Sequence, residues 1–415
     1  MMRKISFIML FVMIASAVFA DNFVLKHDSK SIATGITICF KNKKYLEKKF
    51  NLPGASDFAA HLFKVKAKKF EDEFKLIGAE VQFYDYPFIP FDDYYTNDYF
   101  GFVRIKVLPE NTHKALFLAA KLIDEVLNFN ARDFLIATKS TFGSNVMRNK
   151  AKEKAKSEIW KMYFPDSFVS LPDYMFAPKL SEKRFREFLK AYLENSNIFI
   201  SLYGKFDERA VKEVIEDHFS SKKQSVVHNS LPVARLKVHK KTIEMKSKQA
   251  LVYVVFPVKD GISIQDYARL RVLTANASDK IAFQIREKEG LAYFIGCSIV
   301  YKGGHSFFVG YCGTNPEKAD YVAEKMESLI KNYMLNPVEL KQRDLEKIRN
   351  SIVFSNILKT LPNVNKSFFN ALFELTGHFA YNKNLLDKAL KKGKISRLCG
   401  REYLDTNNYL NIILK

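Results

Sequence analysis

The sequence is poor in cysteine and tryptophan, and this scarcity excludes several classes of protein. Four cysteines and one tryptophan occur in 415 residues. Cysteines so few and so scattered, at Cys39, Cys297, Cys312 and Cys399, exclude a disulfide-rich scaffold or a zinc ribbon. They leave open whether any two form a bridge, and buried free thiols are the simpler expectation. Hydrophobic residues make up 47% of the chain, which is ample for sizeable cores.

Acidic residues are also in short supply. The chain has 45 Asp and Glu against 66 Lys and Arg, so its formal net charge is +21. A strongly positive net charge is typical of proteins that bind nucleic acid, anionic membranes or acidic peptides. The lysines are spread along expected helices, and runs such as residues 64–69 and 150–156 are expected to form solvated helix faces. Without a Gly-rich phosphate loop or an aromatic RNA-binding motif, the sequence disfavours nucleic acid as a partner.

Long hydrophobic runs are absent beyond the first twenty residues. Residues 1–20 have the order of a signal peptide, with Arg3 and Lys4, then an apolar run, then Val18 and Ala20 at the small-residue positions of a cleavage site. The run is short for a membrane span, which takes roughly 20 residues. Cleavage would give a mature chain that begins at Asp21, carries 64 basic against 45 acidic residues and is exported, either to the periplasm or outside the cell. An uncleaved N-terminal anchor is the alternative.

Two pairs of segments repeat each other and predict two similar domains. Residues 99–127 are expected to form a strand and then a helix opened by proline, and residues 306–333 repeat this order. Residues 192–202 and 403–414 are each expected to form a helix end, a polar turn and an apolar strand. Helices in runs, rather than strict alternation with strands, favour an α+β architecture over a doubly wound sheet. We expect an N-terminal domain over 21–219, a linker over 220–234 and a C-terminal domain over 235–415.

The segment Ile285-Arg-Glu-Lys-Glu-Gly-Leu-Ala-Tyr293 is the most informative part of the chain. Arg286 is expected on the last turn of a helix, and Tyr293 at the start of the next strand. A guanidinium and a phenolic hydroxyl are two donors suited to holding a carbonyl or an oxyanion. The structural alternative is a buried cation–π or hydrogen-bonded pair that stabilises the domain.

This segment, with Gly-Thr-Asn-Pro-Glu-Lys-Ala319 behind it, resembles the Arg/Tyr region of the insulinase/pitrilysin-type zinc peptidases, the inverzincins with an H-x-x-E-H site. The resemblance extends over nearly the whole mature chain. It implies two homologous α+β domains that together form one half of a peptidase clamshell. In that family the Arg/Tyr pair lies in the half opposite the zinc.

The residues aligned with the zinc motif of that family no longer match it. Gly54 and Phe58 keep the frame, but Asp57 replaces the first histidine ligand, Ala60 replaces the glutamate, and only His61 survives. Hydrolysis on zinc needs the ligands and also a base that deprotonates the bound water. Ala60 cannot accept a proton, so the general base is missing.

The third zinc ligand is missing as well. The family takes it from a glutamate on a later helix, here expected between Asp133 and Glu153, and no Asp or Glu occurs between those two residues. Asp57 and His61 stand one helical turn apart and could hold a metal weakly with Glu71 or Glu73. The alternative is a His61 that packs or forms a hydrogen bond.

The resemblance implies an exported, non-catalytic partner subunit without a cofactor of its own. It would supply Arg286 and Tyr293, for peptide binding and transition-state stabilisation, to a chamber shared with a zinc-bearing insulinase-like subunit. Proteolysis is then expected only in the heterodimer, with no role for nucleic acid and no stable membrane insertion after signal cleavage. The alternatives are a catalytically dead scaffold and a peptide-binding protein that acts without a peptidase partner.

Overall fold

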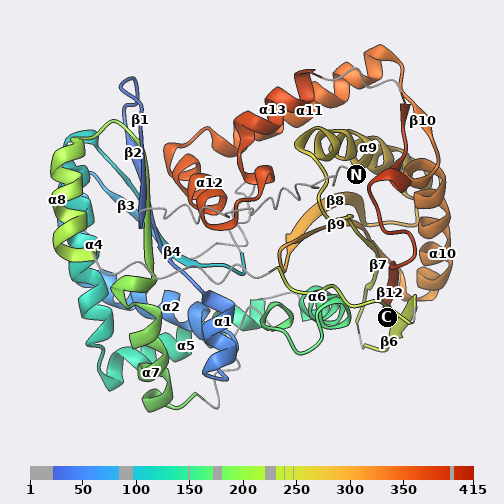
Figure 1. The fold of residues 1–415 in the computed structure, drawn as a ribbon. Coiled ribbons are helices and arrows are strands. Elements are labelled where there is room, and N and C mark those ends of the chain that lie inside the picture. Colours follow the sequence, from blue (N-terminus) through green and yellow to red (C-terminus); the bar gives the residue numbers. More distant parts are fainter. Residues whose placement is uncertain are drawn as a thin grey trace, which may run out of the picture.

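Two five-stranded sheets with the same strand order form the framework of the protein (Figure 1). The structure, a computed structural model, describes residues 22–83, 97–147, 150–171, 180–219, 230–237, 239–245, 247–392 and 397–415. In each sheet one outer pair of strands is parallel and the remaining neighbours are antiparallel. The shared topology confirms two homologous α+β domains. The first sheet has the order β1 (Phe23–His27), β5 (Ile198–Gly204), β2 (Thr34–Phe40), β4 (Gly101–Val107), β3 (Glu80–Gln82), and the second has the order β6 (Lys240–Ile243), β12 (Leu410–Leu414), β7 (Ala250–Pro257), β9 (His305–Thr314), β8 (Phe294–Lys302).

Helices of the N-terminal half pack on the outer side of the first sheet (Figure 1). Their apolar residues recur at helical spacing, so one face of each helix enters a common core. In the helix over residues 112–127, for example, the side chains of Ala115, Ala119, Leu122 and Val126 all lie in that core. These helices are α1 (Lys43–Lys49), α2 (Ala55–Ala67), α3 (Glu71–Leu76), α4 (Thr112–Leu127), α5 (Ala131–Met147), α7 (Glu182–Tyr192) and α8 (Glu208–Phe219).

The C-terminal half surrounds the second sheet in a related way. Proline opens the turn before α10 at Pro316, as Pro109 does before α4, which matches the expected strand-to-helix repeat. In the N-terminal half, Asp207 caps the start of α8, since its Oδ1 accepts from the backbone N–H of Ala210 at 3.1 Å. The helices of this half are α9 (Ile264–Ala282), α10 (Ala319–Ile330), α11 (Gln342–Thr360), α12 (Asn363–Thr376) and α13 (Lys383–Lys392), and a short pair, β10 (Val338–Glu339) and β11 (Arg397–Leu398), completes it.

Each sheet receives on its inner face a helix from the other half of the chain. Helix α6 (Lys150–Tyr163) joins the core of the second sheet, where Tyr163 donates to the carbonyl oxygens of Val255 at 3.1 Å and Asn408 at 3.0 Å. Helix α12 lies on the first sheet, where Thr37 and Ser367 share a buried hydrogen bond of 2.7 Å between their hydroxyls. The two halves are therefore interlocked and cannot part without exposing apolar surface.

A buried polar and aromatic contact adds to this interface. Lys302 of β8 forms an ion pair of 2.6 Å with Asp98, which precedes β4. Next to it the rings of Tyr99 and Tyr301 stack with their centroids 6.0 Å apart. These contacts hold the far end of β8, the strand that begins after Tyr293, against the N-terminal half.

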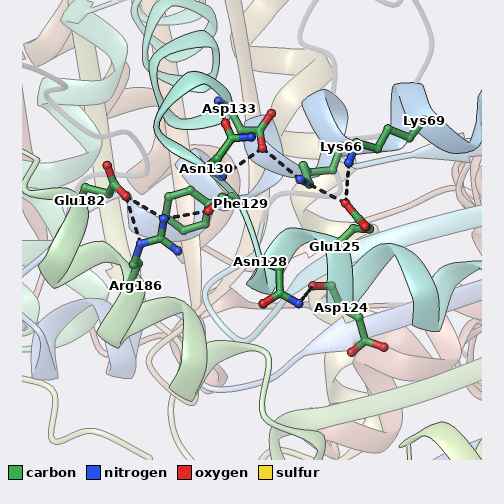
Figure 2. A network of polar contacts seen from close by, with 10 residues as sticks. All are labelled: Lys66, Lys69, Asp124, Glu125, Asn128, Phe129, Asn130, Asp133, Glu182 and Arg186. Carbon is green, nitrogen blue, oxygen red and sulfur yellow. Dashed lines mark hydrogen bonds and ion pairs between the residues drawn. The ribbon is translucent and has the colours of Figure 1, made fainter.

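The expectation that the basic run 64–69 forms a solvated helix face is wrong for Lys66. Lys66 is buried, with 3% of its side chain exposed, and its Nζ lies 3.2 Å from Glu125 and 3.0 Å from Asp133. Lys69 reaches the same Glu125 at 2.9 Å, and Figure 2 shows the two lysines converging on these carboxylates. A lysine can be buried when carboxylates pair with it, and periodicity alone does not reveal such partners.

The four cysteines are free thiols in the structure. Strands β8 and β9 form a hairpin around Gly303 and Gly304, and its register sets Cys297 opposite Gly310 and Cys312 opposite Ile295. Among the described residues, no helix has the length and hydrophobicity that a membrane span requires. The expected signal peptide and residues 220–229 of the expected linker lie outside the described residues.

Candidate functional site

The turn that carries Arg286 is held by backbone hydrogen bonds. After α9 the chain widens into a π-helical turn, Phe283–Glu287, and then reverses at Gly290, whose φ of 63° favours glycine. The N–H of Gly290 donates to the carbonyl of Arg286 at 3.0 Å, and the N–H of Leu291 donates to that of Ile285 at 3.0 Å. The side chain of Ile285 is fully buried, so its neighbour Arg286 points outward.

Tyr293 is fixed against the end of strand β9. Its backbone N–H donates to the carbonyl of Gly313 at 2.9 Å, one residue before β8 begins. Thr314 secures the same turn, because its hydroxyl donates to the carbonyl of Leu291 at 2.6 Å. The backbone of the segment that carries both Arg286 and Tyr293 is therefore tied to α9 at one end and to β9 at the other.

The side chains of both residues are open to solvent. Arg286 is 56% exposed and lies 3.9 Å from Glu287, a long and weak ion pair, and Tyr293 is 62% exposed. The structural alternative required a buried pair, and the structure does not bury either residue. A guanidinium and a hydroxyl so placed are accessible to an external acceptor such as a peptide carbonyl.

A further set of contacts, which sequence patterns did not reveal, ties this turn to α10. Lys325 of α10 forms an ion pair with Glu289, and the hydroxyl of Tyr321 donates to the same carboxylate at 3.3 Å. The hydrogen bond from Lys325 holds the pKa of Glu289 below its ordinary value. Three exposed aromatic rings lie on this turn, at the start of β8 and on neighbouring α10: those of Phe283, Phe294 and Tyr321.

The residues expected to form the degenerate zinc motif lie on α2, which begins after Gly54 with a φ of 79°. His61 is 2% exposed, and its Nδ1 lies 2.8 Å from the hydroxyl oxygen of Ser140 on α5. Asp57 lies one turn earlier on the same helix and Ala60 immediately precedes His61, and both are partly buried. The helix that faces His61 thus offers a serine hydroxyl in place of a carboxylate. Ser140 lies 79 positions away in the chain, and no spacing in the sequence pointed to it.

Two acidic side chains near this helix, those of Asp133 and Glu125, are already paired with lysines. Burial would raise the pKa of Asp133, but hydrogen bonds from Lys66 and from the backbone of Asn130 hold it below its ordinary value (Figure 2). The pKa of Glu125 is also lowered, by hydrogen bonds from Lys69 and Lys66. In the described part of the chain, no three His, Cys, Asp or Glu side chains come together as a metal site requires. The residues present therefore do not fit the zinc of the H-x-x-E-H peptidases.

Comparison with protein families identifies the segment that carries Arg286 and Tyr293. Residues 179–352 match the family described as the peptidase M16 inactive domain. Over these residues, which make up less than half of the chain, the protein is similar to the inactive domain of the M16 peptidases. This confirms the resemblance to the insulinase-like peptidases, and the match covers the Arg/Tyr segment but not the residues expected to form the degenerate zinc motif.

Solved structures show that the fold of the M16 inactive domain extends over nearly the whole chain. A protease from Helicobacter pylori shares 15% identity and a TM-score of 0.73, with 94% of this chain and 96% of that one covered. A peptidase M16 inactive domain from Pseudomonas fluorescens shares 13% identity and a TM-score of 0.71, with 94% and 95% covered. The periplasmic protease PqqL from Escherichia coli shares 12% identity and a TM-score of 0.62, and 94% of this chain matches 43% of that protein.

Proposed function

We propose that this protein is the exported, non-catalytic partner subunit of an insulinase-like zinc peptidase. Its part is to present Arg286 and Tyr293 to a peptide held in a chamber that it shares with a zinc-bearing subunit. The observation that carries the proposal is the exposure of both side chains on a turn whose backbone is fixed at both ends. A fixed backbone with accessible donors is the arrangement that preorganised binding of an oxyanion requires.

In this proposal, the chain contributes to the reaction by donating hydrogen bonds to the substrate. The guanidinium of Arg286 and the hydroxyl of Tyr293 would donate to the substrate backbone or to the oxyanion that develops at the scissile carbonyl. A donor aimed at developing charge typically stabilises a transition state by about 3–4 kcal/mol. The nucleophile and the base must come from the partner, because Ala60 cannot take a proton and His61 is bonded to Ser140.

Export is supported by the N-terminal sequence and agrees with one structural relative. Residues 1–20 have the charge, the apolar run and the small residues of a cleavable signal. Among the proteins of similar fold, PqqL is a periplasmic protease. We therefore place the protein in the periplasm or outside the cell, in the compartment where its zinc-bearing partner would also be found.

The decisive experiment is purification of the full chain from its native host, followed by identification of the protein that co-elutes in stoichiometric amount. A co-eluting H-x-x-E-H homologue, with peptide hydrolysis by the complex and none by either chain alone, is the expected result. Co-elution with a large assembly that hydrolyses no peptide would instead favour the scaffold. A homodimer that binds peptides without cleaving them would favour the independent peptide-binding protein.

A further inference from the structure

Helix α11 presents an apolar stripe to solvent. Phe354, Ile357, Leu358 and, just past the last turn, Leu361 follow the spacing i, i+3, i+4, i+7, so their side chains share one side of the helix. Each of them is 49–66% exposed. The same spacing in other helices of this protein faces a core, as it does in helices of globular proteins generally.

The opposite side of α11 already packs inside its own domain. Leu345, Ile348 and Ile352 belong to the core of the second half. Asn356 donates to Asp387 of α13 at 2.9 Å. These contacts fix the rotation of the helix, so the apolar stripe cannot turn inward. In Figure 1, α11 runs along the upper rim of the molecule, where an external chain can reach it.

The first half of the same helix side is basic. At about 100° per residue, Arg343 and Lys347 fall on the side that carries Phe354 and Leu361, and both are exposed. The acidic residues of these turns, Asp344 and Glu346, fall on its two flanks. One side of α11 therefore offers positive charge in its first turns and apolar surface in its last two.

The size of the stripe limits what it can bind. Four side chains exposed to this degree present roughly 400 Å² of apolar surface. A stable dimer of globular chains usually buries about 800 Å² on each partner, so the stripe alone is too small to hold two copies together. Two copies would also repel each other, because each has a formal charge of +21.

We propose that this side of α11 docks an amphipathic helix of another protein, with two turns of apolar residues followed by acidic residues. The apolar turns would pack along Phe354 to Leu361, as ridges of one helix pack into the grooves of another. The acidic end would lie against Arg343 and Lys347 and would set the direction of the bound helix. This surface lies outside the Arg/Tyr segment, so the proposal is independent of the proposed function.

A pair of synthetic helical peptides tests the charge and the location together. Both carry leucine at i, i+3, i+4 and i+7, and one continues with glutamates where the other has lysines. In fluorescence anisotropy with the full chain, the glutamate peptide should bind and should weaken as salt is added, and the lysine peptide should bind at least ten-fold more weakly. Leu358→Glu and Lys347→Glu should each weaken the glutamate peptide at least ten-fold. Leu76→Glu, at an exposed leucine of α3, is the matched control and should bind like wild type.

Other results overturn the proposal. Equal binding of the two peptides, or binding that survives Leu358→Glu in a protein of unchanged melting temperature, would exclude this occupant. Sedimentation that shows a dimer in wild type and a monomer in Leu358→Glu would assign the stripe to a second copy. Binding to phosphatidylglycerol vesicles that is lost in Leu358→Glu, without binding of the glutamate peptide, would assign it to a membrane surface.

Discussion

The Nδ1 of His61 and the hydroxyl oxygen of Ser140 lie 2.8 Å apart in the interior of the N-terminal half. This hydrogen bond satisfies one ring nitrogen of a histidine that is almost wholly buried, and a buried polar group without a partner would be costly. The surviving histidine of the zinc motif is therefore part of the packing between α2 and α5. This packing role requires no metal at α2.

Metal removal should leave this protein unchanged. The purified chain is expected to contain no stoichiometric zinc and to hydrolyse no peptide, and EDTA should not shift its melting temperature. His61→Ala, in contrast, should lower the free energy of unfolding by about 1–3 kcal/mol, because Ser140 loses its partner and a cavity is left. Metal analysis and thermal melts with and without chelator provide the check. About one tightly held zinc per chain and a melting temperature that falls in EDTA would contradict the prediction.

The N-terminus of protein made in an exporting host should be Asp21. Val18 and Ala20 satisfy the rule for signal cleavage, and the apolar run before them is short for a membrane anchor. N-terminal sequencing of the soluble periplasmic or secreted fraction is the measurement. Ala20→Leu supplies a control, since a bulky residue at the cleavage position should make the longer precursor accumulate. Wild-type protein that begins at Met1 and stays with the membrane would support the anchored form.

The free energy of unfolding should decrease as the pH is lowered from 7 to 4, because His378 is protonated more readily in the unfolded chain than in the folded one. Burial lowers its pKa from 6.5 to about 4. Its Nδ1 accepts from the N–H of Ala380 at 3.3 Å, so the neutral ring carries its proton on Nε2 and donates to Ser306 at 3.1 Å. Because the unfolded chain binds this proton first, the full contribution is present above about pH 6.5 and is lost as pH falls toward 4. The loss amounts to about 3 kcal/mol at most.

Urea titrations between pH 7 and pH 4 measure this contribution. His378→Gln should show a smaller decline of the free energy of unfolding over that window than wild type. His27→Gln, at an exposed histidine of the first strand, is the matched control and should decline as wild type does. Parallel curves for wild type and His378→Gln would show that His378 does not carry the pH dependence.

Gly35 allows the close approach of α12 to the first sheet. A Cβ at this position would collide with the backbone of Asn363 and Val364, which cannot move aside as a flexible side chain can. Gly35→Ala should therefore destabilise the protein by about 1–3 kcal/mol through overpacking. Gly143→Ala on α5 is the matched control: nothing lies near its Cβ, and it should be neutral or stabilising by up to about 1 kcal/mol. Equal stability of both variants in urea would refute the close approach.

The repeated pattern of the chain was sufficient to predict its architecture, but not the contacts between its halves. The two units in which a strand is followed by a helical turn that begins at Pro109 or Pro316 are local features. The hydrophobic periodicity of the sequence therefore predicts them. The exchange of α6 and α12 between the sheets depends on contacts such as that of Thr37 with Ser367, 330 positions apart. No pattern within a short stretch of sequence predicts a contact between residues so far apart. The burial of Lys66 was missed for the same reason, since Glu125 and Asp133 come from other helices.

The Arg/Tyr pair shows the same division between local and distant information. The sequence indicated that Arg286 and Tyr293 are the candidate hydrogen-bond donors, because both residues and the turn between them lie in one short segment. It could not decide between a buried pair and an exposed one. That distinction depends on whether another element covers the turn, and in the structure α10 reaches Glu289 while leaving Arg286 and Tyr293 exposed.

Substitution of the pair separates a catalytic partner from a scaffold. In the complex with the zinc-bearing subunit, Arg286→Ala or Tyr293→Phe should lower peptide turnover about 100-fold while assembly stays intact. Tyr293→Phe deletes only the hydroxyl of a side chain that is 62% exposed, so the melting temperature should not move. Arg209→Ala and Tyr45→Phe remove an exposed guanidinium and an exposed hydroxyl elsewhere and should keep wild-type turnover. Turnover and melting temperature measured on one preparation decide the matter, because unchanged turnover by a fully assembled Tyr293→Phe complex would leave that hydroxyl without a catalytic role.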